Sequence, residues 1–124
     1  MKAAAAALIL MAVLFTAAVL HGQYVDRLTC DLTALEASFP VKTAEKLPPD
    51  PTIGKAEALW QKAEALLSVT VNARQRIAVS TALRSVVCYY ENGTASDYEA
   101  ARDLLREALF NLKRAEEVGF GGLF

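Results

Sequence analysis

Hydrophobic positions divide the chain into one uninterrupted apolar stretch at the start and periodic stretches after it. Residues 3–20 (AAAAALILMAVLFTAAVL) carry no charge, and Thr16 is their one polar member. At about 1.5 Å per residue, a helix of this length spans roughly 27 Å, close to the hydrocarbon thickness of a bilayer. The pattern therefore predicts a membrane-spanning helix over residues 1–21.

The same stretch also fits a secretory signal peptide, which has a basic start, an apolar core and a small-residue cleavage site. Lys2 supplies the basic start, and residues 16–18 (TAA) form a poor cleavage site. The apolar run continues past that site through Val19 and Leu20, which favours an uncleaved signal anchor. A cleaved peptide that releases a secreted protein, and a buried helix of a soluble protein, remain as alternatives.

The charges that flank the stretch predict its orientation. Lys2 and the α-amino group precede the span, whereas Arg27 follows it between Asp26 and Asp31. Because cytoplasmic flanks carry an excess of Lys and Arg, we expect the N-terminus inside. The chain is then a single-pass protein of the cytoplasmic membrane, with its C-terminal domain outside.

Residues 22–39 show the spacing of an amphipathic helix that ends before Pro40. Between the span and this helix, Gly22 is the one residue that disfavours helix, so the two segments are either continuous or separate. The helix either packs on the rest of the chain or stands away as a stalk. Its apolar stripe consists of Val25, Leu28, Leu32, Leu35 and Phe39.

Residues 40–54 contain all four prolines and predict a linker. A helix over 55–69 follows, and Asn72 then suits the N-cap of a helix over 73–90. The expected apolar side of the first helix is Leu59, Ala63, Leu66 and Leu67, with Trp60 beside them. That of the second is Ile77, Leu83, Val86, Val87 and Tyr90.

A turn at 91–93 leads to a last helix over 96–118. Ser96 and Glu99 have capping-box spacing, Asp97 suits the positive first turn, and Gly119 suits a C-terminal cap. Its expected buried positions are Tyr98, Ala101, Leu105, Ala108, Leu109 and Leu112. No strand pattern is present. We expect an all-α fold, with a transmembrane helix followed by a small antiparallel bundle of three to four helices, of which 55–124 form the bundle and its glycine-rich tail.

Charge argues against nucleic-acid binding. Apart from Lys2, the chain has 12 Lys and Arg against 14 Asp and Glu, without the basic face that phosphate backbones require. No polybasic run that would bind lipid headgroups occurs in the sequence either.

Catalytic and metal signatures are also absent from the sequence. His21 is the one histidine and its neighbours supply no partner for a general base, a triad or a metal site. The carboxylate pair Asp103 and Glu107 lies among Arg102 and Arg106, as on a solvated helix face. We predict no enzyme activity, no catalytic residue, no metal and no cofactor.

Cys30 and Cys88 are the two cysteines, and exported domains favour disulfides. Cys30 falls opposite the apolar stripe, however, so an intramolecular bond, two unpaired thiols and an intermolecular bond all stay open. Trp60 suits a core residue or a partner contact. Phe120 and Phe124 either fold back on the bundle or contact a partner.

The layout resembles one family. Trp60 opens LWQKAEALLSV, a helix ends in YYEN before SDYEA, and a leucine-rich helix closes in a terminal Leu-Phe. With the N-terminal membrane segment, this resembles the small bacterial membrane-anchored helical proteins grouped as domain of unknown function 4363. The Ala-rich anchor and the GFGGLF tail depart from the family pattern. The resemblance implies a bacterial cell-surface setting and a helical fold, and it assigns no functional residue.

The leading hypothesis is a non-enzymatic, membrane-anchored helical module that acts through contact with an unidentified protein partner. The alternatives are a homo-oligomeric assembly or stalk protein, in which the apolar stripe of residues 25–39 pairs between chains, and a helical bundle that binds a small ligand. A pilin-like subunit is disfavoured because no acidic residue interrupts the apolar stretch.

Overall fold

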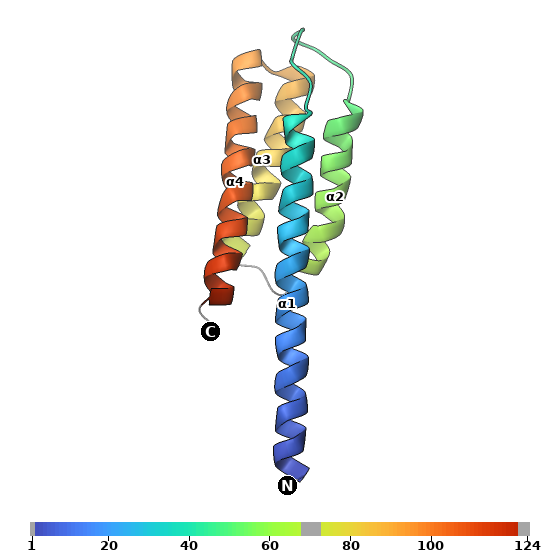
Figure 1. Ribbon diagram of the computed structural model, residues 1–124. Helices are drawn as coiled ribbons and strands as arrows, with labels where there is room; N and C mark the ends of the chain where they lie inside the picture. The colour runs from blue at the N-terminus through green and yellow to red at the C-terminus, as the bar shows by residue number, and fades with distance from the viewer. Residues whose placement is uncertain (1, 68–72, 122–124) are drawn as a thin grey trace.

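The computed structural model describes the backbone of residues 2–67 and 73–121, and the side chains of residues 2–67 and 73–115. Within these ranges the chain forms four helices and no strand: α1 (Lys2–Ala37), α2 (Pro51–Leu67), α3 (Ala73–Asn92) and α4 (Ala95–Gly121) (Figure 1). The predicted all-α fold is confirmed.

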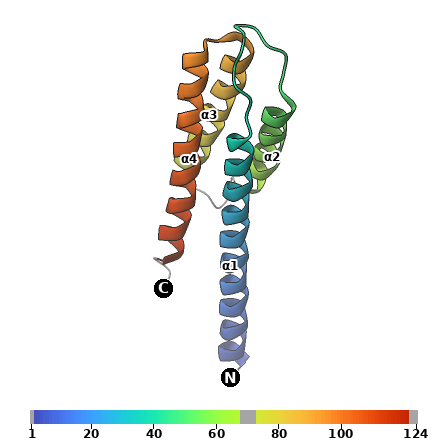
Figure 2. The same cartoon turned by 45° about the horizontal axis from the view of Figure 1, so that its top comes forward.

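The helices run alternately up and down and form a four-helix bundle (Figures 1 and 2). α1 packs against α2 and α4, and α3 packs against α4 and α2. The first half of α1 extends beyond the bundle at one end, the projecting end, where α4 also finishes. The 38–50 linker and the α3–α4 turn lie at the opposite, distal end.

α1 is one continuous helix, so the apolar stretch and the amphipathic stretch are joined without a break at Gly22. Its second half packs in the bundle and is not a free stalk. In the apolar stripe, Leu35 is half-buried and the other four residues are buried, including Phe39 just after the helix. The helix ends at Ala37 because Pro40 disfavours helical backbone at the residue before it.

α2 begins at Pro51, four residues earlier than predicted, because Asp50 caps it. Asp50 Oδ2 accepts hydrogen bonds from the backbone N–H groups of Thr52 at 2.9 Å and Ile53 at 3.1 Å. Proline suits the first helical position because its missing N–H would have no helical partner there. The predicted 40–54 linker is therefore too long at its C-terminal end.

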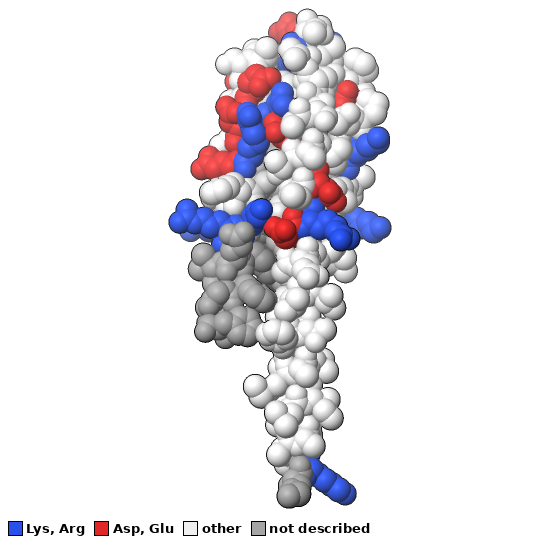
Figure 3. Space-filling view, viewed as in Figure 1, with Lys and Arg blue, Asp and Glu red and all other residues white. Residues whose placement is uncertain are grey.

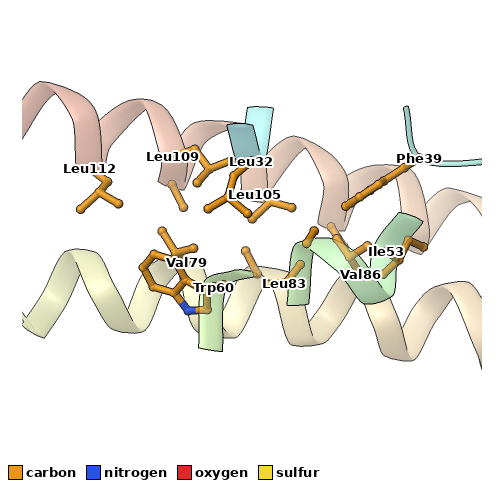
Figure 4. Close-up of a cluster of buried hydrophobic side chains, with 14 of the residues drawn as sticks. Leu32, Phe39, Ile53, Trp60, Val79, Leu83, Val86, Leu105, Leu109 and Leu112 are labelled. Atoms are coloured by element: carbon orange, nitrogen blue, oxygen red, sulfur yellow. The ribbon is translucent and has the colours of Figure 1, made fainter. Parts of the chain in front are cut away.

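The core lies along the bundle axis, and Trp60 and Val79 lie in the part of it toward Leu112 (Figure 4). Two expected core residues are exposed instead, Leu66 at 63% and Ile77 at 59%. The buried faces of α2 and α3 are rotated slightly about the helix axes relative to the predicted faces. A neighbouring apolar residue is therefore buried in place of Leu66 or Ile77. The buried positions of α2 are Ile53, Ala56, Trp60, Ala63 and Leu67, and those of α3 are Val79, Ala82, Leu83, Val86 and Tyr90.

α4 buries all six predicted positions, but both of its predicted ends are wrong. Thr94 caps the helix in place of Ser96, because Thr94 Oγ1 accepts a hydrogen bond from the N–H of Asp97 at 3.1 Å. At the other end, the helix passes through Gly119 to Gly121. A C-terminal glycine cap needs positive φ, and no glycine in the described residues adopts it.

Candidate functional site

The projecting half of α1 is the largest exposed apolar surface of the described chain. Its side chains face solvent on all sides of the helix, and none of the 18 residues of its most apolar window is buried in the bundle. This is the one described helix long and apolar enough to cross a membrane. Exposed fractions along it include 68% for Leu8, 66% for Ile9, 66% for Met11 and 52% for Phe15.

A cluster of polar side chains lies at the distal end, where α1 and α4 meet. Glu36 of α1 is only 2% exposed, and its Oε1 lies 2.9 Å from Arg102 Nε and 3.6 Å from Arg106 Nε of α4. Arg102 Nη2 also donates to the backbone carbonyl of Glu36 at 2.9 Å. The guanidinium therefore neutralises a buried carboxylate and satisfies a carbonyl in the last turn of α1.

Two tyrosines extend this cluster to the linker. The Tyr98 hydroxyl donates to the carbonyl of Pro40 at 2.7 Å, and its ring lies 5.4 Å from that of Tyr90. Arg102 sits over the Tyr98 ring at 5.7 Å. Lys42 Nζ donates to the carbonyl of Tyr90 at 2.5 Å, so a linker residue caps the last turn of α3.

Burial raises the pKa of Tyr98 to about 12, although the Arg102 charge partly opposes this rise. Burial, followed by the charge of Asp50, also raises the pKa of Tyr90. Burial lowers the pKa of Arg102, but its hydrogen bond to Glu36 and the Glu36 charge outweigh that effect and raise it overall. All three groups therefore hold their protons at neutral pH.

The distal cluster is suited to holding the linker against α3 and α4. Each donor named above faces a protein carbonyl or carboxylate, so the cluster presents no activated base or nucleophile. One signal in the sequence could have indicated it: Glu36 lies four residues after Leu32, on the side of the helix that carries the apolar stripe. Neither Glu36 nor Lys42 was among the predicted site residues.

Two of the hollows on the described surface of the bundle involve the linker and the face between α3 and α4. The smaller, of about 280 Å³, lies at the distal end and is lined by Lys42, Thr43, Ala44, Glu45, Gly93, Thr94 and Ala95. The larger is a shallow groove of about 440 Å³ between α3 and α4, which we call the α3–α4 groove. Two exposed apolar side chains line it, Ile77 and Leu104, at 59% and 57% exposure. Between them lie small residues such as Ala78 and Thr81.

The predicted site residues are not brought together. Cys30 and Cys88 are exposed and unpaired, so the structure contains no intramolecular disulfide between them. Trp60 is 2% exposed and its indole Nε1 donates to Ser80 Oγ at 2.8 Å, which matches the first of its two interpretations, a core residue. The side chain of Phe120 and all of Phe124 lie outside the described residues.

Metal-binding side chains do not gather at one place among the described residues. His21 is half-buried beside the projecting end. In the part of the chain that the structure describes, no three His, Cys, Asp or Glu side chains come close enough together to hold a metal ion.

Comparison with known proteins gives no family and no relative. No family model, no curated protein and no solved structure matches the chain.

Proposed function

We propose that the protein is a single-pass membrane protein whose helical bundle lies outside the cytoplasmic membrane and acts by contact with another protein. The observation that carries the proposal is the projecting half of α1, an exposed apolar helix with the length of a bilayer span. A soluble bundle would expose this surface to water at a cost of about 25 cal/mol for each Å². A bilayer removes that cost.

The continuity of α1 supports an uncleaved anchor. Cleavage after Ala18 would cut inside the helix, only seven residues before Val25, which is fully buried in the core. Ala18 and Val19 are themselves half-buried, so the helix already contacts the bundle at the cleavage position. A peptidase needs an extended segment, which this part of α1 does not offer.

The α3–α4 groove is the surface that best fits a protein partner. It is lined by two exposed apolar side chains and several small residues, and Arg74, Glu107 and Asn111 also line it. Apolar surface with a polar margin is the usual composition of a protein interface. The function we assign to the bundle is therefore binding, without catalysis.

A homo-oligomer is the second candidate, but its interface would differ from the one expected from the sequence. The apolar stripe of residues 25–39 is occupied by packing inside one chain, so it is not free to pair between chains. On the bundle, the α3–α4 groove offers exposed apolar side chains for self-association. The same groove therefore serves both candidates, and sedimentation of the full-length protein in detergent separates them.

Alkaline extraction of membranes, followed by N-terminal sequencing of the mature protein, tests the anchor. We expect the protein to stay in the membrane pellet with residues 1–21 intact. A soluble protein that begins near Val19 would refute the proposal.

The two natural thiols test orientation. Cys30 and Cys88 are exposed on the bundle, so a membrane-impermeant maleimide should label both in intact cells. Labelling only after the cells are lysed would place the bundle inside and would contradict the proposed topology.

Site-specific photo-crosslinking tests the binding surface. A crosslinker at Ile77 or Leu104 should capture one discrete protein from intact membranes, whereas one at Val41 should not. Val41 is 74% exposed on the linker and lies outside the groove, so it is a matched exposed control. Equal capture from all three positions would remove the groove as the binding surface.

A further inference from the structure

Folding gathers cations that are scattered in the sequence into one band at the projecting end of the bundle. We call this band the cation belt; its members are Arg27, Lys62, Arg74, Arg76, Lys113 and Arg114, contributed by all four helices. In Figure 3, Lys and Arg side chains, with acidic side chains among them, cross the bundle just above the projecting helix, which is uncharged there except for a basic residue at its far end. No run of the sequence showed this band, because its members lie up to 87 residues apart.

Contacts between the helices set the level of the belt. Lys113 Nζ lies 3.3 Å from Asp26 Oδ1, which places Lys113 and Arg114 beside Asp26 and Arg27. Asp26 is six residues after Leu20, where the apolar stretch ends. At about 1.5 Å per residue, this level is about 9 Å beyond the end of the apolar stretch.

The remaining cations lie within about 6 Å of one another along the bundle axis. Arg74 lines the α3–α4 groove together with Asn111, which is two residues before Lys113. Trp60 and Ser80 share a level through their 2.8 Å hydrogen bond. Lys62 therefore lies about 3 Å nearer the projecting end than that bond. Arg76, two residues from Arg74, lies between the levels of Arg74 and Ser80.

The charge of the bundle is asymmetric along its axis. The projecting end carries the six cations of the belt against four carboxylates. These are Asp26 and Glu64, together with Glu116 and Glu117, which come just after Arg114 in the sequence. The rest of the bundle and the linker carry six cations against ten carboxylates. The positive end is therefore the end from which the apolar helix emerges.

We propose that the cation belt binds the headgroups of anionic phospholipids. The inference rests on the proposed membrane anchor. A hydrocarbon core of about 30 Å within a bilayer of about 40–45 Å leaves a headgroup layer of about 5–8 Å on each side. Long Lys and Arg side chains starting about 9 Å from the hydrocarbon edge reach back into that layer. Arg27, Lys62 and Arg114 are exposed on this end of the bundle.

The binding of lipid to the full-length protein in a neutral detergent tests the proposal. Phosphatidylglycerol and phosphatidylcholine are titrated separately, and bound lipid is counted by native mass spectrometry. Because each Lys or Arg near an anionic surface contributes about 1 kcal/mol, we expect phosphatidylglycerol to bind at least about tenfold more tightly. Equal affinities for the two lipids would overturn the proposal.

Two matched variants locate the binding. Removing three exposed belt cations (R27Q, K62Q and R114Q together) should abolish the preference for phosphatidylglycerol. Removing three exposed cations elsewhere (K46Q, K55Q and R84Q together) should leave it intact. Both variants lose the same charge, so equal loss in the two would show a general charge effect and refute the belt.

Further outcomes distinguish lipid binding from binding of small anions, and failure of the belt from failure of the anchor. Inorganic phosphate at the lipid concentration should leave phosphatidylglycerol bound, and its displacement would show a site for small anions instead. If the protein is retained in membranes but shows no lipid preference, the belt is wrong and the anchor stands. If the protein leaves the membrane on alkaline extraction, the anchor fails and the inference with it.

Discussion

Replacing Arg102 with methionine tests how the distal cluster is held together. Methionine keeps an unbranched stem that can pack against Phe39 and Tyr98, whose rings lie 5.9 Å and 5.7 Å from the guanidinium carbon. It removes the charge and every hydrogen bond that Arg102 donates. The Glu36 carboxylate, with its side chain 3% exposed, then keeps only Arg106 Nε at 3.6 Å.

The expected loss follows from the burial of Glu36. Removing one partner of a buried ion pair typically costs 3–5 kcal/mol, because the remaining charge has no compensation. Arg106 is 49% exposed and offers partial compensation, so we expect the free energy of unfolding to fall by about 3 kcal/mol. Replacing both partners with apolar residues, as in Glu36→Leu with Arg102→Met, should recover all but about 1 kcal/mol.

Urea unfolding of the full-length protein in detergent, followed by tryptophan fluorescence, measures this loss. Trp60 is the single tryptophan and is 2% exposed in the core, so its emission reports bundle unfolding. The matched control is Arg84→Met, an exposed arginine on α3, which should cost less than about 0.5 kcal/mol.

Two results would refute this reasoning. A loss below about 1 kcal/mol, the value typical of exposed pairs, would mean that water reaches the Glu36 carboxylate. A double variant no more stable than Arg102→Met would mean that the lost stability comes from packing and not from the stranded charge.

Three further predictions concern the ends of the helices and the tyrosines. Asp50→Ala should cost about 1 kcal/mol in the same urea assay, since it removes the N-cap of α2, and Asp50→Asn should cost less; equal losses would exclude capping. Gly93→Ala should lower the melting temperature measured by circular dichroism, because its Cβ would lie 2.8 Å from the Cα of Tyr89; an unchanged value would show that the turn relaxes freely. In a spectrophotometric titration, Tyr98 should ionise near its pKa of about 12 and Tyr98→Phe should remove that late phase. Since the pKa of Tyr98 is raised on folding, its contribution to stability is complete below about pH 10 and is lost as the pH rises toward 12.

The four helices could be predicted from the sequence because the local spacing of apolar residues determines where helices form. The 3-4-3-4 spacing of the apolar stripe and the six buried positions of α4 follow from helical periodicity alone. Helix ends and helix rotation were less predictable. Two caps, Asp50 and Thr94, are chosen by side-chain hydrogen bonds that a pattern of apolar residues does not show. Ile77 and Leu66 were misplaced because each has apolar neighbours that fit the core equally well.

The distal cluster and the cation belt could not be predicted, because each depends on which helices meet. Glu36 and Arg102 lie 66 residues apart and pair only after α1 packs on α4. The members of the belt show no local run, and only the up-and-down path of the chain brings them to one level.

The unbroken course of α1 has a mechanical consequence for the bundle. A flexible joint between the projecting half of α1 and the bundle would let the bundle rotate freely. Because α1 is one helix from Lys2 to Ala37, any tilt of its projecting half also tilts the bundle. The distal end of α1 lies 17 residues beyond Leu20, which corresponds to about 25 Å. In a bilayer, the bundle would therefore keep a fixed orientation relative to the projecting helix, and its surface would be accessible only to partners close to the lipid.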